Sequence, residues 1–162
     1  MTTAHDFSFA KLDEPGEIKL SDYAGKAMLV VNVASACGFT PQYRELEALY
    51  EAKAAKGLVV IGVPCNDFGA QEAGTEHEIR DFCDTNYHVK FPMTAKAEIV
   101  SPAKRNPFYA WIARELGDAA LPRWNFHKFL IGKNGQLVEG FGSKATPLGP
   151  QVLAAIDKAL AA

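Results

Sequence analysis

The chain has 162 residues, a formal net charge of −2 and a hydrophobic content of 48%, values that suit one domain over residues 1–162 with a core of normal size. It contains no long basic cluster and no run of roughly 18 apolar residues, so we expect no nucleic-acid partner and no stable membrane insertion. Residues 1–7 lack the pattern of an export signal and the three cysteines are odd in number, so we expect a cytoplasmic protein without structural disulfides.

The first elements that the sequence predicts are a hairpin and a buried strand. Residues 7–11 alternate apolar and polar side chains, residues 14–17 favour a turn, and residues 18–20 continue as a second short strand. Residues 27–34 form a valine-rich and nearly continuous apolar run. This pattern is typical of a parallel strand that is buried on both faces, so we expect it to lie in the middle of a sheet.

A helix and a second strand complete the next unit. Thr40 and Pro41 favour a helix start, because a threonine hydroxyl can cap free N–H groups and proline at the first helical position loses no hydrogen bond. Residues 58–63 are again apolar, and a strand, helix and strand in this order form a right-handed parallel crossover. Cys37 and Cys65 then lie just beyond the carboxyl ends of the two strands, where open α/β sheets hold their sites.

The rest of the chain predicts three helices and one further hairpin. The helices are expected over residues 76–86, 107–116 and 148–161, and the hairpin pairs residues 129–131 with 137–141 through an Asn-Gly turn. The order of all these elements resembles that of a thioredoxin-like fold. We therefore expect an α/β protein with a central mixed sheet flanked by helices and an N-terminal β-hairpin.

Cys37 is the residue at which we expect the chemistry. A thiol near free N–H groups and the positive end of a helix is favoured as the nucleophilic thiolate, although free cysteines also pack as small buried apolar groups. Because residue 40 is Thr40, no Cys-x-x-Cys dithiol forms, and a disulfide partner must be Cys65 or Cys83. Cys65 is nearer by topology, whereas Cys83 lies on the apolar face of a predicted helix. These patterns alone do not choose between the two.

Three segments of the chain closely resemble the signature segments of glutathione peroxidases. They read Asn-Val-Ala-Ser-Ala-Cys-Gly-Phe-Thr at residues 32–40, Pro-Cys-Asn-Asp-Phe-Gly-Ala-Gln-Glu at residues 64–72, and Trp-Asn-Phe-His-Lys-Phe-Leu at residues 124–130. Their order and spacing match, and the resemblance covers nearly the whole chain. Three segments in register are far more specific than any one of them.

The resemblance implies a thiol peroxidase in which Cys37 is the peroxidatic nucleophile. Gln71, Trp124 and Asn125 match the other members of the family's catalytic tetrad. Taken singly, each of these three residues would be interpreted as a loop, core or turn residue. Together, their amide and indole N–H groups can stabilise a thiolate and then the leaving alkoxide. The resemblance implies no metal and no other cofactor.

The resemblance also implies how the oxidised enzyme is reduced. Cys83 matches the resolving cysteine of relatives that use thioredoxin, which favours it over Cys65. Hydrogen peroxide or an organic or lipid hydroperoxide would oxidise Cys37 to a sulfenic acid, Cys83 would condense with it to a disulfide, and thioredoxin, or alternatively glutathione, would reduce that disulfide. Only 12 residues separate Trp111 from Trp124, where tetrameric relatives carry a longer insertion, so a monomer with an open site is implied.

Two other functions use parts of the same pattern. A peroxide sensor that relays oxidation from Cys37 to a partner protein needs the same cysteines but little turnover. A non-catalytic thioredoxin-like binding module does not account for the three intact segments.

Two positions depart from the usual family pattern, Asp67 in place of glutamine and Ala73 in place of proline. A carboxylate beside the site would oppose a thiolate, so we expect Asp67 to point away or to be neutralised. Among the histidines only His127 falls near the site in sequence, and we interpret it as a surface residue.

Overall fold

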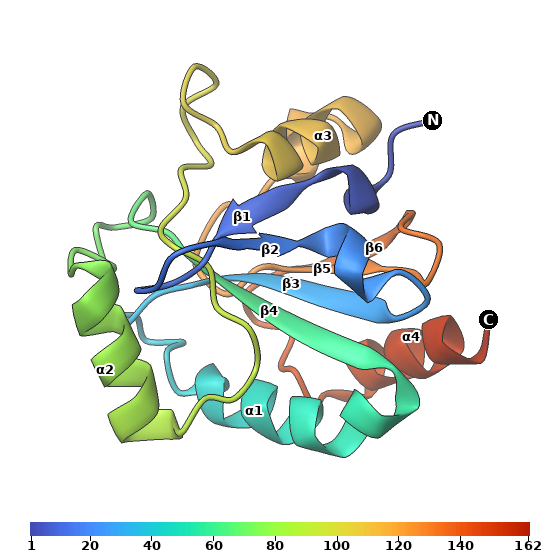
Figure 1. Ribbon diagram of the computed structural model, residues 1–162, viewed down its shortest axis with the longest axis horizontal. Coiled ribbons are helices and arrows are strands. Elements are labelled where there is room, and N and C mark those ends of the chain that lie inside the picture. The colour runs from blue at the N-terminus through green and yellow to red at the C-terminus, as the bar shows by residue number, and fades with distance from the viewer.

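A four-stranded mixed sheet forms the centre of the computed structural model, which describes residues 1–162 (Figure 1). Its strands lie in the order β4 (Leu58–Pro64), β3 (Ala27–Val33), β5 (Lys128–Ile131) and β6 (Leu137–Phe141). β3 and β4 are parallel, whereas β5 is antiparallel to both β3 and β6. The parallel crossover and the Asn-Gly hairpin predicted from the sequence are therefore confirmed.

β3 occupies the middle of this sheet and all its residues are buried. Leu29, Val31 and Val33 belong to the apolar cluster on one face of the sheet. Met28 and Val30 belong to the cluster on the other face. An apolar run with no polar alternation is what a strand covered on both faces requires.

Three helices cover the first face of the sheet, α1 (Gln42–Lys53), α2 (Glu76–Tyr87) and α4 (Pro150–Ala161). Figure 1 shows them together below the strands. Tyr43 of α1 and Cys83 of α2 are buried in this layer. The predicted helix over residues 76–86 is thus confirmed, with its cysteine turned towards the core.

The second face is covered by α3 (Pro107–Leu116) and by the hairpin of β1 (Ser8–Ala10) and β2 (Glu17–Lys19). Phe108 and Trp111 of α3 are buried against it. Judged by length and apolarity together, every helix of the chain falls short of a membrane span. Four short 3-10 helices complete the fold: Ala4–Asp6, Leu20–Tyr23, Ala54–Lys56 and Asp118–Ala120.

Two helix boundaries differ from the sequence prediction. α1 begins at Gln42 rather than at Pro41, and Thr40 does not cap it, because the Thr40 hydroxyl is bonded within the loop that carries Cys37. α4 begins at Pro150, two residues later than predicted. Proline suits that first position because its missing N–H would have no partner in the helix.

α2 begins with a capping box at Thr75, whose Oγ1 accepts a hydrogen bond from the Glu78 N–H (3.2 Å) while Glu78 Oε1 accepts one from the Thr75 N–H (3.1 Å). We predict that Thr75→Ala lowers the free energy of unfolding by about 1 kcal/mol, since it leaves one of these N–H groups without a protein acceptor. Urea denaturation measures the change. Thr75→Ser, which keeps the hydroxyl, is the control, and equal stabilities of the two variants would contradict the assignment.

Candidate active site

Cys37 lies in the loop between β3 and α1 and only 8% of its surface is exposed. Its Sγ accepts a hydrogen bond from the Phe39 N–H at 3.3 Å. Thr40 fixes the turn, because its Oγ1 accepts from the Cys37 N–H (2.9 Å) and donates to the Ala34 carbonyl (2.8 Å). A backbone N–H aimed at sulfur stabilises negative charge on it. The threonine that excludes a dithiol thus also shapes the turn around the thiol.

The loop that follows β4 is bonded directly to the Cys37 loop. The Ala36 N–H donates to the Gln71 carbonyl at 3.1 Å. The buried Glu72 carboxylate accepts from the Ser35 N–H and from the Ser35 hydroxyl, the latter at 3.0 Å. Burial raises the pKa of Glu72, although the two bonds from Ser35 oppose the shift. Asn66 Oδ1 accepts from the Glu72 N–H at 2.9 Å, so this loop is held at both of its ends.

Asn125 joins the segment before β5 to the same loop. Its side chain is fully buried, and Nδ2 donates to Gln71 Oε1 at 2.9 Å and to the Phe68 carbonyl at 3.3 Å. Trp124 is 37% exposed and stands edge-on to the Phe68 ring at 6.3 Å. The structure therefore brings Gln71, Trp124 and Asn125 together at the loop that follows β4. Ala36 bonds this loop to the one that carries Cys37.

Two further residues position Trp124 and Asn125, and sequence reasoning did not find them. Asn32 Nδ2 donates to the Trp124 carbonyl at 3.0 Å, and the Asn32 carbonyl accepts from the Phe126 N–H at 2.6 Å. Ser143 Oγ donates to the Asn125 carbonyl at 2.5 Å. Asn32 left a signal, because it is the one polar residue in an otherwise apolar strand. Ser143 left none, since its partner is distant in sequence.

Asp67 points away from the site, as one of the two expected arrangements required. Its Oδ2 accepts from the N–H groups of Ile99 (2.6 Å) and Val100 (2.9 Å). The interpretation of His127 as a surface residue is wrong, because its ring is partly buried and lies 4.6 Å from the Phe129 ring. Burial lowers the pKa of His127 to about 4, so it is neutral near pH 7.

The other two cysteines are free, fully buried and on opposite faces of the sheet. Cys83 shares the apolar cluster of Cys37, whereas Cys65 belongs to the cluster on the α3 side. Burial raises the pKa of Cys83 to about 11 and that of Cys65 to about 12. Both are therefore thiols at neutral pH, and neither is bonded to Cys37 in this structure.

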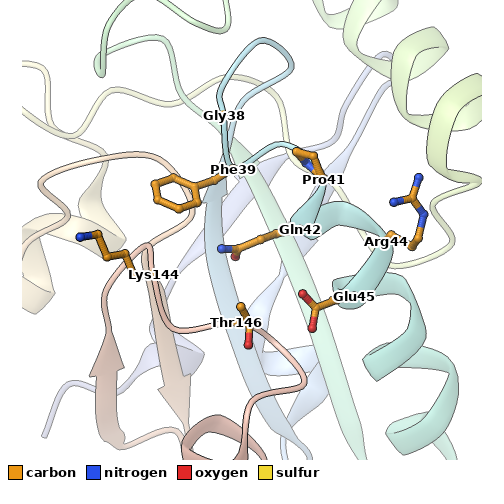
Figure 2. Close-up of a pocket in the computed structure, with 8 residues that line it drawn as sticks. All are labelled: Gly38, Phe39, Pro41, Gln42, Arg44, Glu45, Lys144 and Thr146. Atoms are coloured by element: carbon orange, nitrogen blue, oxygen red, sulfur yellow. The ribbon is translucent and has the colours of Figure 1, made fainter.

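A pocket of about 580 Å³ opens beside the cysteine loop (Figure 2). Gly38 and Phe39 form its wall next to Cys37, and its polar lining comes from Gln42, Arg44, Glu45, Lys144 and Thr146. Figure 2 shows Phe39 and Lys144 on one side of this space and Glu45 on the other. A molecule bound there would lie against the loop that holds the thiol.

Comparison with known proteins agrees with this geometry. Residues 4–113 match the family model "Glutathione peroxidase". The chain is 50% identical over 137 residues to the hydroperoxy fatty acid reductase Gpx2 of Synechocystis sp., covering 85% of this chain and 86% of that protein. It is 37% identical over 172 residues to the thioredoxin/glutathione peroxidase BtuE of Escherichia coli, covering 92% and 93%.

Solved structures support the same assignment. The crystal structure of Trgpx in its apo form superposes with a TM-score of 0.78 at 34% identity and covers 99% of this chain and 97% of that one. A thioredoxin-family thiol:disulfide interchange protein from Chlorobium tepidum TLS, at 17% identity and a TM-score of 0.65, shares the fold alone. The predicted thioredoxin-like fold is confirmed, and the chain belongs to the glutathione peroxidase family of hydroperoxide-reducing enzymes, in its cysteine-containing form.

Proposed function

We propose that the chain, acting as one domain, reduces hydrogen peroxide and organic hydroperoxides with Cys37 as the nucleophile. The observation that carries this proposal is the hydrogen-bonded set around the thiol, in which Phe39 donates to sulfur and Asn125 holds Gln71 beside the cysteine loop. Fatty-acid hydroperoxides are included because the Synechocystis relative is named for reducing them.

In the first step the Cys37 thiolate attacks one oxygen of the peroxide. The S–O bond forms as the O–O bond breaks, and the other oxygen leaves as hydroxide or alkoxide and takes up a proton, which leaves Cys37 as a sulfenic acid. Gln71 Oε1 accepts a hydrogen bond from Asn125, and this bond orients the amide so that its nitrogen can donate to the substrate. Together with the Trp124 indole N–H it would stabilise the negative charge on the leaving oxygen.

In the second step the Cys83 thiol condenses with the Cys37 sulfenic acid. The S–S bond forms and water leaves. Cys83 is favoured over Cys65 because it lies on the same side of the sheet as Cys37. Because Cys83 is fully buried in the middle of α2, we expect α2 to unwind or shift locally when the bond forms.

In the third step a thioredoxin thiolate attacks the Cys37–Cys83 disulfide, and thiol–disulfide exchange returns both cysteines to thiols while thioredoxin is oxidised. Support for this reductant comes from the name of the Escherichia coli relative, a thioredoxin/glutathione peroxidase, which also includes glutathione. An assay coupled to NADPH through thioredoxin reductase, run beside a glutathione-coupled assay with the same peroxides, tests the choice. A clear preference for glutathione would contradict it, and stoichiometric oxidation without turnover would favour a peroxide sensor.

Cys37→Ser is predicted to abolish peroxide consumption, because a serine hydroxyl is not appreciably ionised at neutral pH and is a far weaker nucleophile. The coupled assay measures turnover, and circular dichroism checks that the variant is folded. Turnover at the wild-type rate by folded Cys37→Ser would contradict the assignment.

Cys83→Ser is predicted to leave the first oxidation of Cys37 at the wild-type rate but to stop cycling with thioredoxin. Cys65→Ser, which removes the other fully buried thiol, is the matched control and should cycle normally. Stopped-flow measurement of one turnover separates the two steps. If Cys65→Ser stops cycling and Cys83→Ser does not, the resolving cysteine is Cys65 and the assignment to Cys83 is wrong.

Gly69 allows Trp124 and Gln71 to lie where they do. Its φ is +70°, and a Cβ there would come within 2.7 Å of the Trp124 ring. Gly69→Ala should therefore displace the indole, slow Cys37 oxidation about tenfold and cost about 1 kcal/mol or more of stability. Gly142→Ala, whose added Cβ meets nothing within 4 Å, is the control, and equal rates for both variants would refute this role of the glycine.

A further inference from the structure

Ser143 lies in the loop after β6 and connects two segments that bear on the thiol. Its hydroxyl donates to the Asn125 carbonyl at 2.5 Å. Its carbonyl accepts from Gln42 Nε2 at 2.7 Å. Gln42 follows the cysteine loop directly, and its N–H donates to the Phe39 carbonyl at 2.8 Å. Figure 2 shows the Gln42 side chain reaching towards the loop that carries Lys144.

These bonds close a ring around Cys37. From Ser143 one arm runs through Asn125 to Gln71, whose carbonyl accepts from the Ala36 N–H. The other arm runs through Gln42 to Phe39, whose N–H donates to the Cys37 sulfur. Ser143 joins the two arms, although it lies in none of the three segments that carry Cys37, Gln71 and the pair Trp124 and Asn125.

Lys128 also contacts Ser143, at the backbone carbonyl. Its side chain is fully buried, and its Nζ donates to the Ser143 carbonyl at 3.3 Å. A buried ammonium is unfavourable unless it is hydrogen-bonded, and this carbonyl is its one acceptor in the protein, with Glu45 adding a weaker attraction. The carbonyl is thus fixed by Lys128 and Gln42, which leaves the Ser143 hydroxyl directed at Asn125.

The backbone at Asn125 needs such support. Phe126 has a φ of +63°, a left-handed conformation that is uncommon for a bulky residue. Asn32 donates to the Trp124 carbonyl and Ser143 donates to the Asn125 carbonyl, so the two peptide groups before Phe126 are both hydrogen-bonded. The direction of the Asn125 amide, and with it the contact to Gln71, depends on this backbone geometry.

We propose that Ser143 is a positioning residue for peroxide reduction, holding the Asn125 amide, and through it Gln71, in register with Cys37. The inference rests on the proposed function, in which Asn125 and Gln71 assist the reaction of Cys37. Ser143 itself touches neither the peroxide nor the sulfur.

The test compares single-turnover oxidation of Cys37 by hydrogen peroxide, without reductant, in the intact protein and its variants. Ser143→Ala should slow the reaction about tenfold or more, and Ser143→Thr, which keeps the hydroxyl, should restore it. In an Asn125→Ala background, Ser143→Ala should have no further effect, because its route to the thiol is already cut. Gln71→Ala provides a second background in case Asn125→Ala does not fold. Circular dichroism and thermal melting check each variant.

A wild-type rate for folded Ser143→Ala would overturn the inference while leaving the proposed function intact. The inference would also be overturned if Ser143→Ala slowed Cys37 oxidation by the same factor in the Asn125→Ala and Gln71→Ala backgrounds as in the wild type. The serine would then act by a route that does not pass through these residues. If the wild-type Cys37 does not react with peroxide at all, the proposed function fails and the inference fails with it.

Discussion

The site depends on hydrogen bonds between loops that come together at one edge of the sheet. The carboxyl ends of the parallel strands β3 and β4 meet at this edge, so the loop with Cys37 and the loop with Gln71 leave the sheet side by side. Glu72 accepts from Ser35, and Asn125 donates to Gln71. Because an unpaired buried polar group is costly, these bonds also specify one arrangement of the loops.

This arrangement is obtained at some cost in stability. Burial lowers the pKa of Lys128 to about 8 and raises that of Glu72, so folding disfavours the charged form of each. For Lys128 the native state binds fewer protons than the unfolded state at a pH between about 8 and its usual pKa of about 10.4. Its burial therefore opposes folding below pH 8, and this penalty fades as the pH rises. Replacement of buried charged groups by apolar side chains of similar volume is often neutral or stabilising.

The sequence predicts the elements of this fold well because their signals are local. The run that forms β3 and the Asn-Gly turn lie within a few residues of what they determine. The structure places the residues of the predicted tetrad at one edge of the sheet, and their catalytic roles stay a prediction. The bonds that hold them could not be predicted, since Ser143 meets Asn125 across 18 residues and Gln42 across 101. The sequence pattern predicts a helix cap at Thr40 because it does not reveal the competing partners of the hydroxyl in the loop.

Cys37 and Cys83 lie on one face of the sheet and Cys65 on the other. The identity of the disulfide that forms on oxidation can therefore be measured directly. The reduced protein is treated with one equivalent of hydrogen peroxide, alkylated under denaturing conditions and digested without reductant, and the linked peptides are identified by mass spectrometry. We predict one disulfide, between Cys37 and Cys83, with Cys65 alkylated. A Cys37–Cys65 disulfide, or oxidation that spares Cys37, would contradict it.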